Sequence, residues 1–256
     1  MRSIVLCSAA LLIAAPAMAQ EAIATDRPDF VESSLTVGKR VFQYETSAAT
    51  DWTTTAGTTA RVVATPTLLR YGITNTLELR IETDGFYRAS VEDAGSESGM
   101  ADAAFGLKWH AVDGREAVPS VAFLLHGDVP TGSAAFRGIG IRPSLRAVGE
   151  WALPGDFALG VMPGVAYDAN GGTGQEWTAI LGATVGRPVS DRLRFFVEYA
   201  AEQLPTSQNG GTVALLDLGS AFLITQDIQL DLSYRHGLTD LASDHSIALG
   251  FSQRLR

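Results

Sequence analysis

Alternation of apolar and polar residues recurs from Val41 to the end of this 256-residue chain and limits its fold more than any other feature. Leu77, Leu79 and Ile81 alternate with charged residues, and residues 193–199 and 228–235 repeat the pattern. Successive residues of a β-strand point to opposite faces, so this alternation predicts half-buried strands, and helical periodicity is hard to find. The chain is therefore predicted to be all-β.

The expected strands are too long for an ordinary soluble sheet. Most reach ten residues or more, about twice the usual length, and a tilted strand needs about 9–11 residues to cross a bilayer. The chain is 46% hydrophobic, yet beyond residue 20 it has no apolar run suited to a membrane helix. We predict a transmembrane antiparallel up-and-down β-barrel of about 12 strands, with a soluble periplasmic β protein as the alternative. The expected strands cover residues 40–50, 60–72, 75–87, 100–112, 117–127, 139–151, 155–168, 175–187, 191–202, 212–224, 227–237 and 244–255.

Connections and aromatic residues support the membrane reading. Short connections alternate with longer ones rich in Gly, Ser, Thr and Asn, which is the layout of an outer-membrane barrel. The longer ones are residues 90–99, 130–138, 168–175 and 203–211. Tryptophans lie towards strand ends on the apolar parity, as aromatic girdles at the two membrane surfaces require. They are Trp52, Trp109, Trp151 and Trp177.

The N-terminus has the pattern of an export signal. Arg2 precedes an apolar stretch from Ile4 to Ala15, and residues 17–19 form a small-residue cleavage site. We expect residues 1–19 to be a cleaved signal peptide, 20–39 a periplasmic or lumenal segment, and 40–256 the barrel. The predicted location is the outer membrane. A formal charge of −9 provides no basic excess for phosphates, so no nucleic-acid partner is expected.

The polar face of each strand is predicted to point into the barrel lumen. Charge there needs water or a partner, so the lumen holds either a water-filled passage or a network of ion pairs that plugs it. Twelve strands leave more room than the eight whose side chains fill the interior, which favours a narrow aqueous passage. The predicted pore-lining residues are Glu78, Arg80, Glu82, Lys108, Arg142, Arg146, Glu150, Arg194, Glu198, Asp217, Asp231 and Arg235.

The sequence shows no catalytic motif. None of the four histidines has Ser at the second following position, the spacing that places both on one strand face for proton transfer. Nucleophile-elbow, zinc-protease and Walker motifs are also missing from the sequence. We therefore predict no enzyme activity, no metal site and no cofactor, and interpret each histidine as a rim or turn residue. An outer-membrane lipid-modifying enzyme is the less favoured alternative.

The sequence resembles a known family in several segments taken in order. Residues 25–30 read TDRPDF, and residues 42–46, 69–74, 77–80 and 129–132 continue the likeness. They resemble the outer-membrane β-barrel family described as transporters of the meta-pathway of phenol degradation. The resemblance implies an outer-membrane channel for small aromatic or other apolar compounds, and no binding residue is carried over from it.

The predicted function is passive passage of small molecules across the outer membrane. The expected partners are outer-membrane lipid, a small-molecule solute and the barrel-assembly machinery during biogenesis. The alternative is a closed structural or surface-interaction barrel, with an acidic loop from Glu92 to Glu97 as its contact surface.

Overall fold

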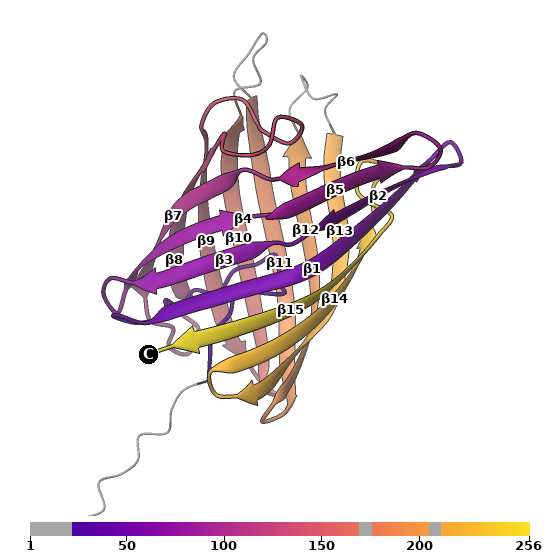
Figure 1. The fold of residues 1–256 in the computed structure, drawn as a ribbon. Coiled ribbons are helices and arrows are strands. Elements are labelled where there is room, and N and C mark those ends of the chain that lie inside the picture. Colours follow the sequence, from indigo (N-terminus) through magenta and orange to yellow (C-terminus); the bar gives the residue numbers. More distant parts are fainter. Residues whose placement is uncertain (1–21, 169–175, 205–210) are drawn as a thin grey trace, which may run out of the picture.

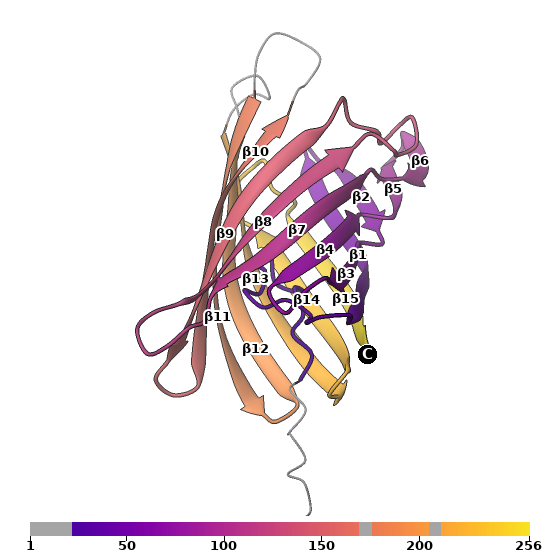
Figure 2. The same cartoon turned by 90° about the vertical axis from the view of Figure 1, so that its left-hand side faces the viewer.

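The computed structural model describes residues 22–168, 176–204 and 211–256, and these are strands and connections with no helix. Twelve antiparallel strands form a closed barrel (Figures 1 and 2). The first and last strands pair from Phe42 opposite Leu255 to Trp52 opposite His245, so the barrel closes without a free edge. The predicted 12-stranded barrel is confirmed. The barrel strands are β1 (Phe42–Thr55), β3 (Thr67–Gly72), β4 (Leu77–Thr83), β7 (Ala103–Val112), β8 (Ser120–Val129), β9 (Arg142–Leu153), β10 (Phe157–Asp168), β11 (Glu176–Ser190), β12 (Leu193–Leu204), β13 (Gly211–Thr225), β14 (Ile228–Gly237) and β15 (His245–Leu255).

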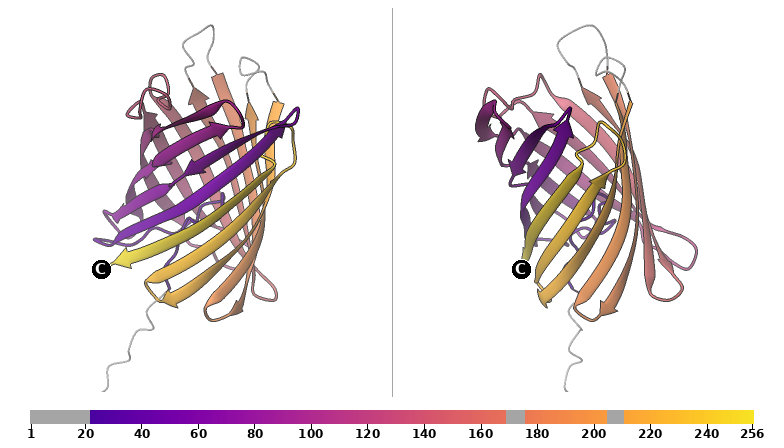
Figure 3. Two further views of the ribbon diagram at one scale, coloured as in Figure 1. Left: turned by 45° about the vertical axis from the view of Figure 1, so that its right-hand side comes forward. Right: turned by 90° about the vertical axis from the view of Figure 1, so that its right-hand side faces the viewer.

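The predicted strands 60–72 and 75–87 are each divided in two, and the predicted strand 100–112 is preceded by a further strand in the predicted loop 90–99. The outer strands are β2 (Thr58–Ala64), β5 (Phe86–Val91) and β6 (Gly95–Met100), which pair in the order β1-β2-β5-β6 and form what we call the outer flap (Figure 3). The breaks are aligned at residues 65–66, 84–85 and 101–102. Pro66 cannot donate to a ladder, and Gly85 has a φ of +67°, which a strand does not allow. The break is held by hydrogen bonds, among them Ala101 N–H to Gly85 O at 2.8 Å.

The outer flap corrects one predicted loop. Residues 90–99 are mostly the hairpin of β5 and β6 with a turn at 92–94, so the acidic stretch from Glu92 to Glu97 is not a long loop. The connection after β8 is long, and it packs on the flap through Phe136, whose ring centroid lies 5.0 Å from that of Tyr87. Residues 169–175 and 205–210, within two other predicted long loops, and the predicted signal peptide lie outside the described residues.

Side chains divide between the two faces of the barrel as the alternation predicts. Outward-facing apolar residues are widely exposed, with Trp177 at 59% and Phe105 at 55%, as expected of a surface that lipid covers. The inner face is unusual because its fully buried side chains include Arg70, Lys108 and Glu78. No described helix is long and apolar enough to cross a membrane.

Residues 22–41, which precede β1, lie within the barrel and are called here the N-terminal segment (Figures 1 and 2). The segment has no strand or helix of its own, so its backbone groups need other partners. It is tied to the end of β3 by the hydrogen bond from Arg40 N–H to Gly72 O at 2.7 Å. The contacts of its other residues with the inner face define the site.

Candidate functional site

Carboxylates of the barrel wall satisfy the backbone of the N-terminal segment. Glu198 accepts hydrogen bonds from the backbone N–H groups of Phe30 and Val31, at 2.6 and 2.7 Å. Glu45 accepts hydrogen bonds from the backbone N–H groups of residues 26 and 27. Glu150 accepts one from the N–H group of residue 34, and Glu78 accepts one from that of residue 37. Ionised acceptors form hydrogen bonds about twice as strong as neutral ones. These four carboxylates thus hold an irregular chain in one conformation.

Cations of the wall bind the carboxylates of the segment. Asp26 lies 2.7 Å from Lys108 Nζ, 2.5 Å from Arg80 Nη1 and 3.4 Å from Arg70 Nη1. Arg70 and Arg80 face each other directly in the β3–β4 ladder, a position in which like charges repel. Asp26 and Glu78, which also contact both guanidiniums, offset this repulsion.

Two further segment carboxylates bind the wall at other points. Glu32 lies 2.7 Å from Arg80 and 2.9 Å from Arg146. Asp29 lies 3.1 Å from Arg194, across the barrel from β4. Segment and wall therefore carry complementary charges along most of the segment's length.

The remaining predicted pore-lining residues also have partners. Arg27 of the segment lies 3.7 Å from Asp231, and Arg235 donates to Asp217 at 3.0 Å. Glu82 binds Arg80 at 2.8 Å, and Arg142 binds Asp102 at 2.8 Å. Three other predicted pore-lining cations, Lys108, Arg146 and Arg194, form their ion pairs with carboxylates of the segment rather than with those of the wall.

An apolar patch of the inner face holds the middle of the segment. Val31 packs against Ala122, Leu124, Val148 and Met162, all of which are buried. Gly182 lies directly beneath it, since a Cβ there would come 2.6 Å from Val31 Cγ2. The polar-lumen prediction gave no indication of this patch.

Two cavities lie on opposite sides of the segment. The larger, about 610 Å³, opens between the segment and the outer flap, and Phe30, Asp84, Tyr87, Asp102 and Phe136 line it. The smaller, about 190 Å³, lies towards the short turns and is lined by Ile23, Glu150 and Arg194 among others. Asp29 lines both, so its pair with Arg194 lies where the two cavities approach each other.

Sequence reasoning missed two features of this site. Asp26, Asp29 and Glu32 were not proposed as site residues, because an irregular segment has no periodicity to show which side chains point to the wall. The interpretation of the histidines was wrong for His126, which lies within β8 with a residue exposure of only 4%. Its parity with Ala122 and Leu124 places it on the inner face, a signal present in the sequence.

Asp102 fixes the long loop over the outer cavity, and its titration gives a testable pH dependence. It accepts hydrogen bonds at 2.8 Å from the backbone N–H groups of Gly132 and Gly138 and from Arg142. Burial raises the pKa of the Asp102 carboxyl, but these donors outweigh it and hold the pKa below the ordinary 3.8. Because the folded pKa is lowered, the stabilisation is fully present above pH 3.8 and is lost as the pH falls through the folded value.

We expect Asp102→Asn to loosen this loop at neutral pH. Hydrogen bonds to a charged group contribute about 1.5–3 kcal/mol, so trypsin cleavage after the exposed Arg137 should become at least about tenfold faster. Asp93→Asn, in the exposed β5–β6 turn, is the matched control and should leave the rate unchanged. Equal rates for the Asp102 variant and the wild type at pH 7.5 would contradict the prediction.

Closed strand pairing, a lipid-type outer surface and a charged, partly filled lumen define a transmembrane β-barrel of the outer-membrane class. Residues 25–255 match the family described as "Putative MetA-pathway of phenol degradation", and the chain belongs to that family. No curated protein matches the sequence.

Solved outer-membrane barrels share this fold. The COG4313 outer membrane channel from Pseudomonas putida F1 is 15% identical with a TM-score of 0.64, over 89% of this chain and 99% of that one. The NanC porin is 10% identical with a TM-score of 0.54, over 84% of this chain and 100% of that one. The translocator domain of the autotransporter NalP from Neisseria meningitidis is 13% identical with a TM-score of 0.56, over 85% of this chain and 89% of that one. The chain is thus a porin-like barrel of the outer membrane.

Proposed function

We propose that the protein is a passive channel for small molecules, in which the N-terminal segment restricts the lumen and shifts to let solute pass. The observation that carries the proposal is the pair of cavities on either side of the segment, which both reach the Asp29–Arg194 ion pair. Solute would then move from one cavity to the other as this pair opens. The twelve predicted pore-lining residues would line the widened path together with the segment.

The proposed solutes are small aromatic or other apolar compounds. Most residues that line the larger cavity are charged, but Phe30, Leu68, Tyr87 and Phe136 lie among them and would supply the apolar contacts with such a solute. The description of the family names phenol degradation, and one solved relative in fold is a channel. The proposal gives the chain no enzymatic role and includes export through the signal peptide, contact with membrane lipid and insertion by the barrel-assembly machinery.

A disulfide between segment and wall tests whether the segment must move. The Cβ position of Gly182 is 2.6 Å from Val31 Cγ2, so the two Cβ atoms lie within about 4.1 Å, a separation that a disulfide bridges. The only native cysteine, Cys7, falls in the predicted signal peptide, so Val31→Cys/Gly182→Cys forms one defined link.

The double variant is compared with each single variant in liposomes, using a graded series of charged aromatic solutes that do not cross lipid unaided. Oxidised protein should show no solute flux, and reduction should restore the flux of the single variants. Equal flux in the oxidised and reduced states would show that the segment need not move. A wild type with no flux for any solute would overturn the channel proposal itself.

A further inference from the structure

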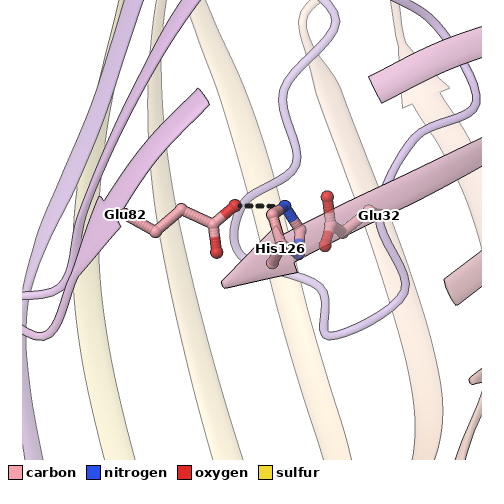
Figure 4. Close-up of side chains that lie close together, drawn as sticks. All are labelled: Glu32, Glu82 and His126. Carbon is pink, nitrogen blue, oxygen red and sulfur yellow. Dashed lines mark ion pairs between the residues drawn. The ribbon is translucent and has the colours of Figure 1, made fainter. Parts of the chain in front are cut away.

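Glu32, Glu82 and His126 meet at the edge of the larger cavity, from three separate parts of the chain (Figure 4). Glu32 belongs to the N-terminal segment, Glu82 to β4 and His126 to β8. One ligand atom of each lies within 4.8 Å of the others, and His126 Nε2 is 3.0 Å from Glu82 Oε1. We propose that these three side chains form a binding site for a divalent first-row transition-metal ion, with Zn²⁺ as its probe, which ties the segment to the wall.

The histidine points into this cluster, and its side chain is 3% exposed. Among the described residues Nδ1 has no hydrogen-bond partner, and the contact of Nε2 is the 3.0 Å ion pair with Glu82. Glu32 Oε2 is also buried, and its contacts are the ion pairs with Arg80 at 2.7 Å and Lys108 at 3.8 Å. A buried nitrogen without a partner is costly, and a metal ion would satisfy it.

Gly106 of β7 makes this arrangement possible. It faces His126 across the β7–β8 ladder, and a Cβ at this position would overlap the imidazole ring. The ring therefore lies over the glycine, across the strand that separates β4 from β8, and so reaches Glu82.

The donor set fits a transition metal better than Ca²⁺ or Mg²⁺, since imidazole suits Zn²⁺, Fe²⁺ or Ni²⁺ and the other two prefer oxygen alone. Zinc takes nitrogen and oxygen ligands at about 2.0–2.2 Å in a tetrahedral arrangement, so its ligand atoms lie about 3.3–3.6 Å apart. The three ligand atoms lie within 4.8 Å of one another, so the glutamate side chains would close on the ion. Three protein ligands leave a fourth position open to water or a solute.

Neighbouring charges are compatible with a bound cation. Arg80 contacts both Glu32 and Glu82, and Arg146 contacts Glu32. Carboxylates that bind a metal are commonly oriented by such hydrogen-bonding neighbours. Their positive charge is opposed by Asp84 and Asp128, which line the same cavity and form none of the ion pairs found among the described residues.

The test is metal binding to the full mature chain in detergent, measured by equilibrium dialysis with Zn²⁺ and by the absorption spectrum of Co²⁺. We expect one tightly bound ion per chain, and at least about 100-fold weaker binding for His126→Gln. Removing a group that only hydrogen-bonds a ligand already lowers metal affinity by about 10–100-fold, and removing the ligand itself should lower it more. Glu82→Gln should weaken binding as well while keeping the side-chain shape. His245→Gln is the matched control, because the exposed rings of His236 and His245 stack at 5.3 Å and offer a separate surface for Zn²⁺.

Hydrogen exchange gives a second measurement of the tie. Zn²⁺ should slow amide exchange in residues 30–33 of the wild type and of His245→Gln, and leave His126→Gln unaffected. Retention of a folded barrel in each variant is checked by its faster migration in unheated gels than in heated gels. Wild-type protein that binds no stoichiometric ion, or binding lost in His245→Gln and kept in His126→Gln, would overturn the proposal.

Discussion

Deletion of residues 22–37 should raise the single-channel conductance in planar bilayers at least about fivefold, because a twelve-stranded barrel without its contents has a lumen wide enough for water and ions. The deleted part includes Asp26, Asp29 and Glu32, which carry the ion pairs to the wall. The deletion leaves residues 38–41, whose hydrogen bonds with Gly72 fix the start of β1. The wall charges freed by the deletion would then be hydrated.

Two controls accompany this measurement. Lys39→Met lies just beyond the deleted part at an exposed position and should conduct like the wild type. A chain in which residues 22–37 are replaced by Gly and Ser keeps the length but loses the anchors, and should conduct in noisy, unsteady steps. An unchanged conductance after deletion would mean that the segment does not restrict the path.

Asp26→Asn should lower the free energy of unfolding by about 3–5 kcal/mol, the usual cost when one partner of a buried ion pair is removed. The substitution leaves Arg70, Arg80 and Lys108 with less compensation, and all three side chains are at most 1% exposed. Urea unfolding in detergent micelles, followed by tryptophan fluorescence, measures the loss.

A double-mutant cycle separates this charge effect from a general loss of packing. Lys108→Met in the Asp26→Asn background removes one of the uncompensated cations and should recover part of the stability. Lys39→Met again serves as control, because exposed substitutions change stability by at most about 0.5 kcal/mol. Purely additive effects of the two substitutions would show that Asp26 and Lys108 are not coupled.

The barrel itself was predictable because its main determinant is local. Alternation fixes which residues of a strand face lipid, and closure then follows from pairing each strand with its neighbours. The division of two predicted strands also had local signals in Pro66 and Gly85, but alternation on both sides of each break hid them. The three breaks lie at the same level of the sheet because neighbouring strands are paired there. The sequence of a single strand does not show this alignment.

The arrangement of the lumen was predictable only in part. Parity identified wall residues such as Lys108 and Glu198, but not their partners, because those belong to a segment without periodicity. The choice between a water-filled passage and an ion-paired one depended on what occupies the lumen. The family resemblance includes Asp26 and Asp29 within TDRPDF, yet a motif alone does not say that its carboxylates reach opposite walls.

Hydrogen bonding between the segment amides and the wall carboxylates bears on the order of assembly. The segment is the first part of the described chain, whereas Glu198 lies on β12 and the seam that closes the barrel joins β1 to β15. The segment therefore reaches all of its partners only when the last strand has been added and the seam forms. Until then its amides and the charged inner face are hydrated. We therefore expect the seam and the last contacts of the segment to form together, so that the barrel closes with the segment already inside.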